Sequence, residues 1–254
     1  MTPEIDAVVA QLDAAVATAR AARDRLGYLT AMYRRTTCAV RDQVEAGAFD
    51  DADRMGQFVT RFAGRYLGPL AAWRAGQPVP RSWRVADAAA ADAGKAILQH
   101  LLLGINAHVN LDLAVAAAEL RPGPAIFSLH DDFLRVNAIL VSLVEPVRAC
   151  VGRFSPMLDV LDRVGGRDDD QILNLSIRVA RDEAWSQAVT IEAADDSRHA
   201  ELVDSLDRRV ALLGRLVAEP GGLLGRAVDV VAATESGDVV AVIDALAQVT
   251  PPPL

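Results

Sequence analysis

Two histidines and an aspartate lie close together in an otherwise apolar stretch of this 254-residue chain. His100, His108 and Asp112 are separated mainly by leucine, alanine and valine, with amide side chains between them. A polar group buried without a hydrogen-bond partner costs roughly 1–3 kcal/mol, so a sequence selected only for folding would avoid this pattern. Imidazole and carboxylate groups bind divalent metals and carry protons. The stretch therefore predicts a chemical site.

The spacing of these residues fits a helix. At about 100° per residue, His100, His108 and Asp112 fall at about 0°, 80° and 120° around the helix axis. His108 and Asp112 stand at positions i and i+4, from which two side chains of one helix reach the same ion. We therefore predict that His100, His108 and Asp112 bind a divalent ion, which would be zinc, manganese or iron. A second polar stripe, which we expect to tie helices together, consists of the amides Gln99, Asn106 and Asn110.

A second group of polar residues follows a predicted turn. The Pro-Gly-Pro sequence at 122–124 should end the first helix, because proline lacks the backbone donor that a helix needs. A helix beginning near His130 would then fold back antiparallel to the first and bring His130 or Asp132 close to Asp112. Metal sites in helical bundles are commonly built from ligands on facing helices. We predict His130 and Asp132 as catalytic residues, which would complete the metal shell or act as general base.

Four further side chains are candidates for binding a substrate: Arg65, Tyr66, Asn110 and Asn137. Each of these predictions has a structural alternative. A buried histidine is most often a hydrogen-bonded core residue, and aromatic residues at helical spacing more often pack in a core than line a substrate site. The aspartates at 168–170 follow two glycines, and such a run is most often a helix cap.

The composition excludes several classes of function. A net charge of −8 argues against a nucleic-acid-binding protein, which usually presents a basic face. The chain contains no P-loop, dinucleotide-binding fingerprint or nucleophile elbow, so we expect no nucleotide or flavin cofactor. The two cysteines form no CxxC motif, which favours a reducing compartment.

We also expect no membrane segment. The first residues lack the basic and apolar regions of a signal peptide. The best candidate for a membrane span is interrupted by Asn137, Glu145 and Arg148. We predict a cytoplasmic protein that acts on a small-molecule substrate, has neither a nucleic-acid nor a membrane partner, and is compatible with a homodimer.

The periodicity of apolar residues is helical along the whole chain. Between residues 4 and 25, for example, apolar side chains recur at intervals of three and four. We find no internal repeat, no alternation typical of a sheet, and no linker that would divide the chain. The prediction is one all-α domain over 1–254, a bundle of about eight to ten helices with a frayed tail at 248–254. The expected helices are 4–25, 29–45, 51–73, a long helix from Ser82 or Asp87 that contains both histidines, 128–144, 155–164, 168–192, 196–217 and 238–248.

Several short motifs occur together in one known family. They are FAGRYL at 62–67, PRSW at 80–83, LQHLLLGINAHVNLDL at 98–113, Asp132-Phe133 with Val136-Asn137, and Arg181 with Ala184-Trp185. In these motifs, over roughly residues 28–190, the chain resembles a family of helical actinobacterial proteins known only as a domain of unknown function. The resemblance implies an all-α fold and the same site, but no established reaction.

A weaker similarity concerns the His-x-x-x-Asp pair from His108 to Asp112. It is similar to a helical pair in the zinc-dependent phospholipase C and single-strand nuclease class. The chain lacks the N-terminal tryptophan ligand and the signal peptide of that class, and it has too few histidines for three zinc ions. We use the similarity only as an analogy.

Together these observations predict a small-molecule enzyme with a buried His/Asp site. We expect it to depend on a divalent metal and to be hydrolase-like, or a lyase or cyclase of secondary metabolism. Two alternatives stay open. One is a metal-free acid–base or cyclase pocket, and the other is a non-catalytic helical module that binds a partner.

Overall fold

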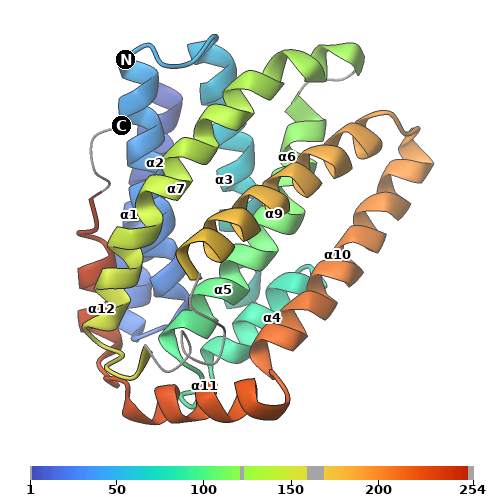
Figure 1. Ribbon diagram of the computed structural model, residues 1–254. Helices are drawn as coiled ribbons and strands as arrows, with labels where there is room; N and C mark the ends of the chain where they lie inside the picture. The colour runs from blue at the N-terminus through green and yellow to red at the C-terminus, as the bar shows by residue number, and fades with distance from the viewer. Residues whose placement is uncertain (1, 121–122, 159–168, 251–254) are drawn as a thin grey trace.

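The protein is described by a computed structural model that covers residues 2–120, 123–158 and 169–250, with side chains at 123–124 and 169–177 left out (Figure 1). Among these residues all regular structure is helical and no strand occurs, which confirms the predicted all-α fold. The helices are α1 (Pro3–Ala22), α2 (Leu26–Glu45), α3 (Ala52–Arg74), α4 (Arg81–Ala90), α5 (Ile97–Ala107), the π-helical η1 (His108–Asp112), α6 (Leu113–Leu120), the 3-10 helix η2 (Gly123–Leu129), α7 (His130–Gly152), α9 (Asp169–Glu192), α10 (Asp196–Ala218), α11 (Gly222–Thr234) and α12 (Val239–Leu246).

Short polar side chains begin several of these helices. Asp51 accepts a hydrogen bond from the backbone N–H of Arg54 and so caps α3. Asp195 accepts one from the backbone N–H of Arg198 at the start of α10. Each aspartate satisfies a donor that the first turn of a helix leaves free, and its negative charge interacts favourably with the helix dipole.

The structure corrects three predicted boundaries. The long helix expected from Ser82 is broken at 91–96, so α4 and α5 are separate elements. Pro146 lies inside α7, which continues to Gly152 because the packing of the remaining turns outweighs one missing donor. A further helix, α11, follows the glycines after Pro220. The expected helix at 155–164 and the aspartates at 168–170 fall mainly outside the described residues and side chains.

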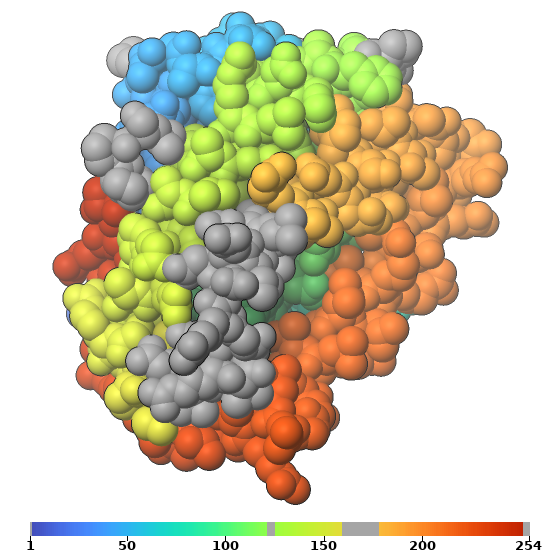
Figure 2. Space-filling view, in the orientation of Figure 1, coloured from blue at the N-terminus to red at the C-terminus, as the bar shows by residue number. Residues whose placement is uncertain are grey.

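A continuous helix formed by α5, η1 and α6 runs through the middle of the bundle (Figure 1). These 24 residues, Ile97–Leu120, have a mean hydropathy of 1.5 and are long and apolar enough to cross a membrane, although 72% of the most apolar window is buried inside the protein. The sequence prediction overlooked this segment. Its burial is typical of a core helix: α2, α4 and α10 pack around α5, and α3 and α9 pack against α6. Figure 2 shows that α7, α9, α10 and α11 cover most of one face.

The C-terminal segment is attached to the bundle as far as it is described. The side chain of Val249 is buried, and its backbone carbonyl accepts a 2.6 Å hydrogen bond from Nε of Arg35. The predicted tail at 248–254 is therefore held at its start, and 251–254 lie outside the described residues.

Candidate functional site

His108 and Asp112 begin and end the π-helical turn in the central helix. Nδ1 of His108 lies 3.1 Å from Oδ2 of Asp112, so the two side chains meet as their spacing predicts. Both side chains are almost completely buried. Single π-helical turns inside α-helices are rare and are frequently found at functional sites. The turn therefore marks this pair as a candidate site on grounds other than residue type.

The carboxylate of Asp112 has partners from two other helices. Trp83, on α4, donates a hydrogen bond of 3.0 Å from its indole N–H to Oδ2. Nε of Arg65, on α3, lies 3.9 Å from Oδ1. Burial raises the pKa of Asp112, and the contacts with His108, Arg65 and Trp83 oppose this rise. The site thus consists of a buried carboxylate in contact with an imidazole, an indole and a guanidinium.

Aromatic rings enclose His108. Its imidazole stacks on the ring of Phe62, with centroids 3.8 Å apart and planes 4° apart. Tyr33 approaches edge-on with its centroid at 4.4 Å. Burial lowers the pKa of His108, whereas the hydrogen bond with Asp112 raises it. Because burial is the larger effect, the imidazole is held in its neutral form.

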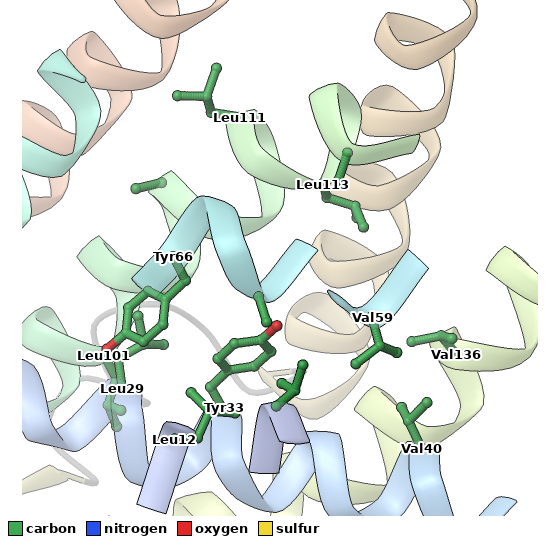
Figure 3. Close-up of a cluster of buried hydrophobic side chains, with 14 of the residues drawn as sticks. Leu12, Leu29, Tyr33, Val40, Val59, Tyr66, Leu101, Leu111, Leu113 and Val136 are labelled. Atoms are coloured by element: carbon green, nitrogen blue, oxygen red, sulfur yellow. The ribbon is translucent and has the colours of Figure 1, made fainter. Parts of the chain in front are cut away.

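Three polar atoms of the site have no hydrogen-bond partner among the described residues. They are Nε2 of His108, Nε of Arg65 and the hydroxyl oxygen of Tyr33, and all three are buried. Tyr66, by contrast, shares a hydrogen bond of 2.5 Å with the hydroxyl of Thr30. Figure 3 shows the rings of Tyr33 and Tyr66 near each other with their hydroxyls pointing to opposite sides. Eleven buried side-chain atoms of the described residues lack a hydrogen-bond partner, and the three at this site are compatible with a ligand or water bound there.

A surface hollow of about 350 Å³ borders the site. Arg65 and Leu111 line this hollow. Arg65 lies beside the carboxylate of Asp112, and Leu111 precedes Asp112 in the chain. The volume lies within the range of small-molecule sites. The other lining residues that matter here are Val115, Glu119, His199 and Val203, the last two from α10. Nη1 of Arg65 also lies 3.2 Å from Glu119. Arg65 therefore stands between the hollow and the buried pair.

A family model with the description "Family of unknown function (DUF5995)" matches residues 5–220. The chain belongs to this family. The match confirms the resemblance to a family of unknown function, and it spans all the residues of the site. No curated protein and no solved structure matches the chain.

In this DUF5995 chain His100 lies apart from the His108–Asp112 pair. Its ring packs edge-on against Tyr28, with centroids 5.8 Å apart. Eight residues separate His100 from His108, which is about 12 Å along a helix, too far for both to bind one ion. Among the described residues, no group of three or more histidine, cysteine, aspartate or glutamate side chains could hold a metal ion. The predicted ligand set His100, His108 and Asp112 is thus not assembled.

The structure likewise does not bring Asp132 to Asp112. Asp132 accepts hydrogen bonds from the backbone N–H of Asp50 at 2.8 Å and from Arg135 at 2.6 Å, and it pairs with the buried guanidinium of Arg54. Burial raises the pKa of Asp132, but these hydrogen bonds outweigh it and lower the pKa overall. Arg54 and Arg65, which contact the two aspartates, lie three turns apart on α3. Asp132 joins α7 to the segment that begins α3.

The antiparallel packing predicted for the helix after the turn was wrong, which explains why Asp132 lies away from Asp112. We expected the helix after the turn to lie along the histidine helix, but α9 packs along η1 and α6, while α7 packs mainly against α2, α9 and α12. His130, at the start of α7, lies against Trp185 of α9, with ring centroids 4.7 Å apart. Neither the connection through η2 nor the position of α9 could be inferred from a local pattern.

The predicted amide stripe ties helices together. Gln99 donates hydrogen bonds to the carbonyls of Val217 and Ala218, and Asn106 donates one to the carbonyl of Val210. All three acceptors belong to α10. Asn110 donates to Oδ1 of Asn106 instead of facing the hollow.

The remaining predicted substrate residues differ in their surroundings. Asn137 has a buried side-chain oxygen that forms no hydrogen bond with any described residue, but Asn137 belongs to α7. Among the four predicted residues, only Arg65 lines the hollow. Sequence reasoning missed Trp83, Phe62 and Tyr33 as neighbours of the pair, because aromatic residues on α2, α3 and α4 give no signal of a shared site until the helices pack.

Proposed function

We propose that this protein is a small-molecule enzyme in which His108 acts as a general base oriented by Asp112. The observation that carries the proposal is that Nδ1 of His108 faces Asp112 at 3.1 Å, while Nε2 is buried and has no partner in the described chain. When the carboxylate accepts the Nδ1 proton, the free basic position of the ring is Nε2. A neutral imidazole in this tautomer presents an unprotonated Nε2 at pH 7, which is the form that a general base needs.

The surrounding groups support this role. As Nε2 takes a proton, the imidazolium that forms is stabilised by the negative charge of Asp112. The indole of Trp83 and the charge of Arg65 in turn stabilise that carboxylate. A base held by a third group in this way serves two kinds of reaction: it activates water, or it removes a proton from carbon. The reaction class we propose is therefore hydrolysis or a lyase or cyclase step.

The hollow beside Arg65 provides the route for the substrate in this proposal. An anionic substrate group would compete with Glu119 for the guanidinium of Arg65, which lies 3.2 Å from that carboxylate. Movement of Arg65 toward the substrate would open the wall between the hollow and Asp112. The apolar side chains of Leu111, Val115 and Val203 would contact the rest of a small molecule.

A divalent metal and a cytoplasmic location remain separate predictions. His108 can act as a base without a metal ion. The metal prediction is therefore tested independently of the proposed role of His108. Elemental analysis of protein purified without a nickel tag, and thermal shifts on adding zinc, manganese or iron, test the metal.

The deciding experiment determines the protonation state of His108 by nitrogen NMR of ¹⁵N-histidine-labelled protein. We expect the Nδ1–H tautomer at pH 7, with an unprotonated Nε2. The four histidines are assigned with single His→Gln variants. An Nε2–H tautomer would leave no basic nitrogen for the reaction and would overturn the proposal.

A second experiment links this base to a ligand. Small molecules that raise the melting temperature of the wild-type protein are screened again with His108→Gln and with the control His130→Gln, whose imidazole packs against Trp185 away from the pair. We expect a ligand of the site to shift the Nε2 resonance of His108 in the wild-type protein. We expect its turnover to be lost in His108→Gln and retained in His130→Gln. Ligands converted equally by both variants would contradict the proposed role.

A further inference from the structure

Five leucines are exposed where α10 meets α11. Leu212, Leu213 and Leu216 lie in the last turns of α10, and Leu223 and Leu224 lie in the first turn of α11. Their exposed fractions run from 47% to 75%, whereas leucines of the core are below 10%. Only three residues separate the two helices, so these side chains share one corner of the molecule, at the lower end of α10 in Figure 1. Clustered exposed apolar residues of this kind mark interaction sites.

The same corner carries four exposed charges, two of each sign. Arg215 and Glu219 lie beside the leucines of α10, and Arg226 and Asp229 lie on α11. None of these four side chains forms an ion pair or side-chain hydrogen bond within the described part of the chain. We call these five leucines and four charged residues the α10–α11 corner.

The charges indicate what covers the leucines. An anionic lipid surface or a nucleic acid would attract the two arginines but repel Glu219 and Asp229, which leaves no net electrostatic gain. A second copy of the chain presents the same leucines and the same balanced charges. In a two-fold interface each patch contacts itself, so the arginines of one copy are available to pair with the acidic residues of the other. We propose that the α10–α11 corner binds the α10–α11 corner of a second copy of this chain.

This interface would leave the candidate site open. The hollow is lined by the first half of α10, from His199 to Asp207, whereas the corner begins at Leu212. Dimerisation would instead support the end of α10 whose carbonyls, at Val217 and Ala218, receive the hydrogen bonds of Gln99. The proposal is therefore independent of the proposed chemistry of His108.

Sedimentation velocity over a concentration series tests the interface. We expect a dimer for the wild-type protein, and a dissociation constant raised by roughly 30-fold or more in Leu216→Glu, the loss expected at a central interface residue. Leu134→Glu is the matched control, because Leu134 is also exposed but lies on α7, and it should leave the dimer intact. Circular dichroism and melting temperature establish that both variants are folded. A monomeric wild-type protein at the highest soluble concentration would overturn the proposal.

A charge exchange tests the pairing across the interface. One variant carries Arg215→Glu and Arg226→Glu, and the other carries Glu219→Arg and Asp229→Arg. Each alone should be monomeric through like-charge repulsion, and an equimolar mixture should form a heterodimer. Failure of the mixture to associate would contradict the proposed contacts. Sedimentation of wild-type monomer with phosphatidylglycerol vesicles, without dimer formation, would assign the corner to a lipid surface instead.

Discussion

Replacing His100 with phenylalanine should change how the stability of the protein depends on pH. The ring of His100 is buried against Tyr28, and Nε2 has no partner within the described chain. Burial, assisted by the positive charge of Arg25, lowers the pKa of His100 from 6.5 to about 4. Phenylalanine has a similar shape and does not titrate, so His100→Phe removes the titration while keeping most of the packing.

The sign and the size follow from the shift in pKa. Between pH 6.5 and pH 4 the unfolded chain binds a proton at His100 that the folded protein does not bind. The stability linked to His100 is therefore complete above pH 6.5 and is lost as the pH falls toward 4. A shift of 2.5 units corresponds to about 3 kcal/mol of unfolding free energy. Between pH 6.5 and pH 4, the unfolding free energy of His100→Phe should fall by about 3 kcal/mol less than that of the wild-type protein.

Asp87 should act in the opposite direction over the same range. Burial, assisted by the negative charge of Asp24, raises the pKa of Asp87 from 3.8 to about 7. Here the folded protein holds the extra proton, so this contribution is complete below pH 3.8 and is lost as the pH rises through 7. Its size is about 4 kcal/mol. The pH-dependent contributions of Asp87 and His100 to the unfolding free energy nearly cancel in the wild-type protein. Asp87→Asn removes the contribution of Asp87, so the uncompensated contribution of His100 should make this variant less stable in acid.

Urea unfolding followed by circular dichroism at pH 7 and at pH 4.5 measures both effects. Tyr28→Phe is the control for altered packing around His100, because the pKa of Tyr28 is about 12 and lies outside this range. We expect the unfolding free energies of Tyr28→Phe and of the wild-type protein to change in parallel with pH. If His100→Phe also changes in parallel with them, His100 is not held neutral by burial and the reasoning fails.

Three further substitutions test the packing of the bundle and of the site. Asp132→Asn should lower the unfolding free energy by about 3–5 kcal/mol, because a buried guanidinium loses its anion, and urea titration measures this loss. Gly104→Ala places a Cβ 2.5 Å from Cδ2 of Leu29, and the displacement of α2 from α5 should cost about 1–3 kcal/mol in the same assay. Trp83→Phe removes the indole donor of the site carboxylate and should cost about 1–3 kcal/mol, seen as a lower melting temperature. A neutral result for Trp83→Phe would mean that the carboxylate is not charged in the folded protein.

Local patterns in the sequence were sufficient for the parts of the fold that depend on neighbouring residues. The helical class and the contact between His108 and Asp112 both follow from spacings of three or four residues. The role of Gln99 and Asn106 as ties to α10 followed from their position on a separate stripe of the helix.

The surroundings of the pair depend instead on residues far apart in the chain. Trp83 and Arg65 reach Asp112 only because α3 and α4 pack beside the central helix. The prediction for Asp132 was wrong about its neighbours because a turn at 122–124 does not determine which helix fills the space beside α6. Likewise, the break at 91–96 separates α4 from α5, and it has no strong local signal besides Gly94.

The combination of groups around Asp112 is hard to explain by folding alone. Taking a carboxylate out of water costs several kcal/mol, and well-packed apolar residues of similar volume are often as stabilising as a buried ion pair. Here the compensation is also incomplete, since Nε2 of His108 has no hydrogen-bond partner among the described residues. Apolar residues at these positions, in a regular α-helix, would avoid both costs. The pair, its π-helical turn and the neighbouring hollow therefore support the proposal of a ligand that uses the free nitrogen of His108.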